Sequence, residues 1–202
     1  MHGLTRIQAL LKALLESDKY IVRLKLEEGT KRLTHLFFAH KKSLTLLAEF
    51  PEVVLMDCTY KTNRYRMPLL NIVGTTQLNT TFLISGCFIK GEKEEDYLWA
   101  LSQWNDVREK FNIPSPGVVL TNADKSILKV LPKTLPNAAH LLCLWHVNKN
   151  IGKRMKPYFR KEYKGADNAQ ERTNFIEAQW KDFLLDWMSV VRSTTELEYK
   201  IN

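Results

Sequence analysis

The stretch VVLMD, at residues 53–57, is a short apolar run that ends in a carboxylate, Asp57. Such a run, separated from the preceding helical pattern by Pro51, is typical of a buried strand. A second run, VVLTNAD at residues 118–124, ends in Asp124. Open α/β sheets place ligand sites at the carboxyl ends of their strands. The sequence therefore predicts a central strand at 53–58, and it raises the question of whether the two acids form half of a metal site or only end two strands.

The residues that follow the first run predict a mixed sheet. Apolar runs at 69–76 and 82–89 come after short polar turns, which indicates an antiparallel meander with the strand at 53–58. Next come a helix at 94–111, a strand at 118–121, a helix at 125–131 and a strand at 138–144. Because helical crossovers join parallel strands, the order β-β-β-α-β-α-β predicts an α/β fold with a mixed sheet.

Accessory elements are predicted on both sides of this core. Residues 4–17 place apolar side chains at helical spacing, residues 20–26 and 32–39 form a predicted hairpin, and 41–50 a second helix. Further helices are predicted at 147–159 and 173–191. We expect a helix-hairpin-helix lead-in at 1–50, a core at 51–160 and a C-terminal helical segment at 161–202.

Composition is that of a globular protein inside the cell. The chain has 202 residues, a net charge of +8 and a pI near 9.3, which favours an anionic partner but also serves solubility. Three cysteines, Cys58, Cys87 and Cys143, stand far apart, so no disulfide framework is indicated. The sequence shows no signal-peptide layout and no run of about 18 apolar residues. We expect a soluble intracellular protein without a membrane partner.

Two interpretations fit each of the two acids. If the first and fourth strands are parallel neighbours, the carboxylates of Asp57 and Asp124 come close and repel, and a hard cation such as Mg²⁺ relieves this repulsion. Asp124 in TNADKSIL equally suits a helix N-cap, and Asp57 in MDCTY suits the start of a turn. The residues alone leave both interpretations open.

A C-x-x-H pair, Cys143 and His146, stands at the end of the last predicted strand. A structural zinc site needs four ligands, and no second pair has a useful spacing, although His140 is nearby. Zinc is therefore not expected. A packed thiol and a hydrogen-bonded histidine at a strand-to-helix corner are the preferred interpretation.

Basic residues gather in two places. Lys61 and Arg64 follow Asp57 directly, and residues 149–164 carry seven cations against one acid, among them Lys149, Lys153 and Arg154. Such stretches bind the phosphate backbone of nucleic acids, or they form a solvated helix face. Neither interpretation is excluded by the sequence.

Four ordered motifs resemble a known family. DCTYKTNRYRMPLLNIVG (57–74), GEKEEDYLWAL (91–101), VVLTNADKSI (118–127) and HLLCLWHVNKNI (140–151) resemble the transposase domain of Mutator-like elements, in the style of fungal members. The resemblance covers about residues 33–151. It implies a ribonuclease-H-like fold whose central strand is flanked by the second and fourth. It also implies a nuclear protein that can form a homo-oligomer. The implied Asp-Asp-Glu site cuts and joins DNA at transposon ends with two Mg²⁺ or Mn²⁺ ions.

The family's functional positions map onto this chain one by one. Its first Asp falls on Asp57 and its second on Asp124, which would be catalytic and metal-binding, and its C-x-x-H signature falls on Cys143 and His146. An acid before its Y-x-W motif falls on Glu92, to which we assign no catalytic role.

The family's third acid has no counterpart in this sequence. It is a Glu in a T-N-x-x-E-S-like motif that follows a helical insertion, and no such motif occurs here. We expect a truncated or domesticated copy, with residues 161–202 as the start of that insertion. The chain would then be an incomplete transposase, a decayed relic, or a non-catalytic DNA-binding regulator similar to the plant far-red-response factors.

Overall fold

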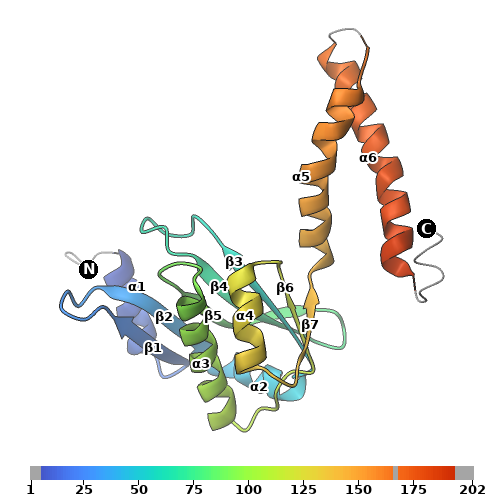
Figure 1. Cartoon of the computed structure of the whole chain (residues 1–202). Coiled ribbons are helices and arrows are strands. Elements are labelled where there is room, and N and C mark those ends of the chain that lie inside the picture. Colours follow the sequence, from blue (N-terminus) through green and yellow to red (C-terminus); the bar gives the residue numbers. More distant parts are fainter. Residues whose placement is uncertain (1–5, 166–167, 194–202) are drawn as a thin grey trace. The chain divides into compact units, whose positions relative to one another are not determined.

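β3 (Val53–Thr59) is an interior strand of a seven-stranded mixed sheet in the order β1-β2-β5-β4-β3-β6-β7, and it is the middle one of the five strands that remain without the N-terminal hairpin β1-β2 (Figure 1). The computed structural model describes residues 6–165 and 168–193. Its elements divide into two units, one ending at Cys143 and one starting at Leu144. The first unit holds α1 (Arg6–Leu15), β1 (Tyr20–Leu26), β2 (Leu33–His40), α2 (Lys41–Glu49), β3, β4 (Leu69–Thr75), β5 (Thr81–Phe88), α3 (Glu94–Lys110), β6 (Val118–Thr121), α4 (Lys125–Thr134) and β7 (Ala139–Leu142), and the second holds α5 (Leu144–Glu162) and α6 (Ala169–Arg192).

Strand pairing confirms the predicted topology. β3, β4 and β5 form an antiparallel meander, whereas β6 pairs with β3 in parallel and β7 pairs with β6 in parallel. β3 is therefore flanked by the second and fourth strands of the β-β-β-α-β-α-β order, which is the ribonuclease-H-like arrangement. The predicted N-terminal hairpin, β1 and β2, extends this sheet at β5.

Alternation along β3 separates the core from the site. Val54, Met56 and Cys58 are buried, and they join one core cluster with apolar residues of α3 and α4. These two helices lie side by side across one face of the sheet (Figure 1). Because successive strand residues point to opposite faces, Asp57 belongs to the face away from this core. The core thus fixes the strand that carries the acid without burying the acid itself.

Several helix boundaries differ from those predicted, and the largest shift is at α6, which begins at Ala169, four residues before the predicted start. α4 does not stop before Pro132 but continues to Thr134. A proline removes one backbone donor, and here Leu135 N still donates to Leu131 O at 2.7 Å while the Thr134 hydroxyl donates to Val130 O. α5 begins at Leu144, three residues earlier than predicted, directly after β7.

A buried histidine–aspartate pair joins β2 to α3. His35 Nε2 lies 3.0 Å from Asp96 Oδ1, and Asp96 Oδ2 accepts from Lys93 N at the start of the helix. Burial lowers the pKa of His35 below its usual value, although the charge of Asp96 raises it. The imidazole is therefore held in its neutral form.

This pair predicts a pH dependence of stability. Because the folded-state pKa of His35 lies below the unfolded value of about 6.5, the unfolded chain takes up the proton first as the pH falls. The contribution of His35 to the free energy of unfolding is present above about pH 6.5 and is lost below it. Urea unfolding across this range, compared with His35→Gln, measures the effect. Parallel pH profiles for the two proteins would contradict it.

The second unit is a helical hairpin. α5 and α6 run antiparallel, and Trp187 Nε1 donates to Asn148 Oδ1 at 2.9 Å between them (Figure 1). The rings of Trp180 and Phe183 stack at 5.7 Å, and Phe159 packs against Phe183. These contacts pack the aromatic residues of α6 against each other and against α5. Within the described residues, no helix has the length and apolar character needed to cross a membrane.

Candidate metal centre and nucleic-acid interface

Asp57 lies inside β3 rather than in a turn. The strand continues through Cys58 to Thr59, so a turn-starting role for this acid is wrong. Its pairing partner in β4 is Asn71, whose Nδ2 donates to Thr59 Oγ1 at 2.8 Å. Opposite partners share a face of the sheet, and Asp57 is exposed there. The carboxylate is thus accessible to a cation from solvent.

Asp124 is the N-cap of α4. Its Oδ1 accepts hydrogen bonds from Ser126 N at 2.9 Å and from Ile127 N at 3.0 Å. Its own backbone N–H donates to the Oδ1 of Asn122. The capping interpretation is therefore confirmed, but within the described residues these bonds use only Oδ1. A helix cap and a cation ligand are compatible roles for one carboxylate, because the second oxygen can take the cation.

The structure brings the two acids to one edge of the sheet. Met56 and Thr121 are the last paired residues of the parallel strands β3 and β6, and Asp57 and Asp124 follow one and three residues later. Within the described residues, no group of three His, Cys, Asp or Glu side chains is placed to hold a metal ion. Two carboxylates still fit Mg²⁺ or Mn²⁺, since Mg²⁺ often takes only one or two carboxylates from a protein.

Beside this edge, Glu92 connects two tyrosines. Its Oε1 accepts from the Tyr60 hydroxyl at 2.7 Å and from the Tyr97 hydroxyl at 3.1 Å, and the Tyr97 oxygen lies 3.5 Å from Cys58 Sγ. Burial raises the pKa of Cys58 to about 12, and the charges of Glu92 and Asp57 add to this effect. Burial likewise raises the pKa of Tyr60 and of Tyr97. All three groups keep their protons at neutral pH.

Sequence reasoning missed this network. Glu92 was noticed only through its family position, and neither tyrosine was singled out. The available signal was weak: Tyr60 follows Asp57 by three residues, and Tyr97 opens the Y-x-W motif. Their meeting depends on the packing of α3 against β3, which no local pattern specifies.

The loop after β3 presents the predicted basic residues to solvent. Lys61 and Arg64 are exposed, and they border a hollow of about 470 Å³. Asn63 shapes this loop, because its Oδ1 accepts from Tyr65 N and Met67 N while its Nδ2 donates to Met67 O. The Arg64 guanidinium lies 4.8 Å from the centre of the Tyr65 ring. The arrangement suits contact with a phosphate backbone next to Asp57.

The boundary between the two units falls inside the C-x-x-H motif. Cys143 ends the first unit, where its backbone N–H donates to Thr121 O at 2.7 Å, and its thiol is half-buried. His146 belongs to the first turn of α5, with its ring 4.7 Å from that of Trp145. The structure therefore assigns the two residues to separate units.

The three basic residues predicted on α5 do not share one face. Lys149 and Lys153 border the groove between α5 and α6, whereas Arg154 is exposed outside it. Lys156, which the sequence pattern did not single out, borders the groove as well. Helical spacing was the signal that could have found it, because residues 149, 153 and 156 recur on one side of a helix.

A family model and several known proteins match this chain. A family model described as "MULE transposase domain" matches residues 53–150, which run from the start of β3 into α5. Protein FAR1-RELATED SEQUENCE 2 of Arabidopsis thaliana is 26% identical over 168 residues, or 81% of this chain and 20% of that protein. Protein FAR-RED IMPAIRED RESPONSE 1 of the same plant is 28% identical over 179 residues, or 87% of this chain and 21% of that protein. The chain spans about a fifth of these relatives.

One solved structure also aligns with the chain. The catalytic core of HTLV-2 integrase, in complex with magnesium and in a trimeric form, gives a TM-score of 0.33 at 12% identity over 72% of this chain and 88% of that one. The fold assignment rests on the strand order described above and not on this alignment.

Proposed function

Because residues 53–150 of this chain belong to the MULE transposase domain family, we propose that the domain acts on DNA as a transposase core and holds Mg²⁺ or Mn²⁺ at Asp57 and Asp124. The observation that carries the proposal is the position of both acids just beyond Met56 and Thr121, the last paired residues of the parallel strands β3 and β6. The substrate would be transposon-end DNA, and the protein would act on it in the nucleus.

The acidic and the basic residues of the chain have different roles in this proposal. Asp57 offers an exposed carboxylate, and Asp124 offers one whose orientation is fixed by its bonds to the first turn of α4. Lys61 and Arg64 would bind the DNA backbone beside them. A bound divalent cation would supply positive charge to the attacking and leaving oxygens of the phosphodiester.

A second candidate is a regulator that binds DNA without cutting it. Two observations favour it: the relatives include a protein named for the far-red response, and no third acid joins the pair within the described residues. The two candidates differ in one measurable respect, which is whether the cation site contributes to the interaction with DNA.

We expect Mg²⁺ to strengthen DNA binding about tenfold through the Asp57 site, the size of one good charge-assisted contact. Fluorescence anisotropy of labelled duplex DNA, with Mg²⁺ or with EDTA, measures this increment. Asp57→Asn should remove it, and Asp106→Asn, the same change at an exposed acid of α3, should keep it. A DNA affinity that changes neither when Mg²⁺ is added nor when Asp57 is replaced by Asn would instead support the regulator.

A further prediction concerns strand transfer. Because no third acid joins the pair to hold a metal within the described residues, we expect little or no strand transfer from residues 1–202 alone. Robust Mg²⁺-dependent transfer that Asp57→Asn abolishes would contradict this expectation. It would also place the third acid within the chain.

A further inference from the structure

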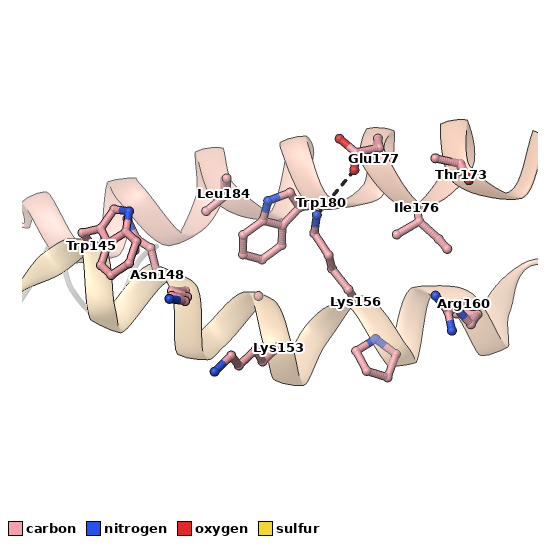
Figure 2. Close-up of a pocket in the computed structure, with 13 residues that line it drawn as sticks. Trp145, Asn148, Lys153, Lys156, Arg160, Thr173, Ile176, Glu177, Trp180 and Leu184 are labelled. Carbon is pink, nitrogen blue, oxygen red and sulfur yellow. Dashed lines mark hydrogen bonds and ion pairs between the residues drawn. The ribbon is translucent and has the colours of Figure 1, made fainter. Parts of the chain in front are cut away.

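A groove of about 830 Å³ runs between α5 and α6 in the second unit. Four cations from α5 border it, Lys149, Lys153, Lys156 and Arg160, together with two indole rings, Trp145 and Trp180. We call these six residues and the space between them the hairpin groove. Figure 2 shows Lys156 reaching from α5 toward Trp180 and Glu177 on α6.

The four cations of the hairpin groove form a stripe whose positive charge is neutralised by few acidic side chains. They stand at positions i, i+4, i+7 and i+11, which places them along one side of α5. Glu177 is the only acid among the described residues that border the groove, and it pairs with Lys156 at 3.4 Å. Like charges at this spacing repel one another. A bound polyanion would remove that repulsion.

The two tryptophans add flat apolar surfaces next to the charges. Trp145 is 60% exposed, and Lys149 Nζ lies 4.4 Å from the centre of its ring. Lys156 Nζ lies 5.5 Å from the centre of the Trp180 ring. An exposed cation–π contact changes an equilibrium constant roughly two- to fivefold. Stacking a base on an aromatic ring changes it about five- to hundredfold. A base can therefore replace a lysine on the ring, and the lysine is then available to a phosphate.

We propose that the hairpin groove binds a short single-stranded stretch of DNA, with its cations along the phosphates and bases stacked on Trp145 and Trp180. The proposal rests on the proposed function, which makes DNA the partner. Stacking on an indole requires an unpaired base face, and a duplex does not offer one. The stripe spans about 16 Å of helix, a length that suits a stretch of a few nucleotides.

The test is binding of a labelled oligothymidine of about ten nucleotides to the full chain at about 50 mM salt, followed by fluorescence anisotropy. Trp145→Ala should weaken binding about five- to hundredfold. The double variant Lys149→Ala, Lys153→Ala should lower the dependence of log affinity on log salt by about 1.4, since each single-strand phosphate contact contributes about 0.7. Circular dichroism of each variant checks that the exposed substitutions leave the helices intact.

Arg154→Ala is the matched control, because Arg154 neighbours Lys153 but lies outside the hairpin groove. It should change affinity much less than Lys153→Ala. Equal losses for these two variants, or a loss of duplex affinity in Trp145→Ala as large as its loss of oligothymidine affinity, would each overturn the proposal. Tighter binding of oligouridine or of polyglutamate than of oligothymidine would overturn it as well.

Failure of this inference is distinguishable from failure of the proposed function. If groove variants weaken oligothymidine binding but no cation binds at Asp57, only the proposed function is contradicted. Cation binding at Asp57, with oligothymidine affinity unchanged by every groove variant, would remove only the inference.

Discussion

Asp57→Asn is expected to weaken Mn²⁺ binding at least about tenfold to hundredfold, the loss that follows even when outer-shell partners of a metal ligand are removed. The fold should remain intact, since Asp57 is exposed on its strand and surface changes of this kind alter stability by less than about 0.5 kcal/mol. Isothermal titration with Mn²⁺ measures the affinity, and urea unfolding measures the stability. Asp106→Asn, which removes the same charge elsewhere, should leave the affinity unchanged.

Two substitutions of Asp124 distinguish its role as a helix cap from its role as a cation ligand. Asparagine caps a helix about as well as aspartate, so Asp124→Asn should keep the two bonds to Ser126 N and Ile127 N while losing the charge. Asp124→Ala loses both and should cost about 0.5–2 kcal/mol of stability. If Asp124 were only a cap, Asp124→Asn would leave Mn²⁺ affinity as it was. That result would contradict the paired site.

Trp104→Ala is expected to lower the free energy of unfolding of the first unit by about 3–5 kcal/mol. Trp104 is fully buried in α3 and belongs to the core cluster that supports the buried face of β3. The substitution deletes the whole indole from a close-packed core that can refill the space only in part. Urea denaturation monitored by circular dichroism measures the change.

Two variants sharpen this second prediction. Within the described residues the Trp104 Nε1 has no hydrogen-bond acceptor, so Trp104→Phe removes an unsatisfied donor and should cost clearly less than Trp104→Ala. Leu98→Ala, on the same helix but 43% exposed, should cost less still. A loss below about 1 kcal/mol for Trp104→Ala would contradict the position of α3 in the core.

Much of the first unit could be predicted from its sequence because local patterns and global fold agree there. VVLMD specifies a buried strand, the turns after it are short, and the helical crossovers require β6 and β7 to be parallel. The same logic placed Asp57 and Asp124 at one edge. It did not decide between cap and cation ligand for Asp124, because both roles use the same residue at the same place.

The remaining features depend on contacts between distant segments. Tyr60 and Tyr97 meet at Glu92 only after α3 packs on the sheet, and His35 finds Asp96 across 61 residues of sequence. The cationic stripe on α5 follows from helical spacing, but the approach of Trp180 from α6 does not. Periodicity predicts which face a residue occupies, whereas its partner is set by packing.

The most direct measurement of the central claim is anomalous X-ray scattering from crystals of the protein grown with Mn²⁺. The account predicts an anomalous peak in contact with a carboxylate oxygen of Asp57 and of Asp124, with Asp124 Oδ1 still bonded to Ser126 N and Ile127 N. The peak should be absent from crystals of Asp57→Asn. Ordered Asp57 and Asp124 side chains at saturating Mn²⁺, with no peak between them, would contradict the claim that these two acids form a cation site.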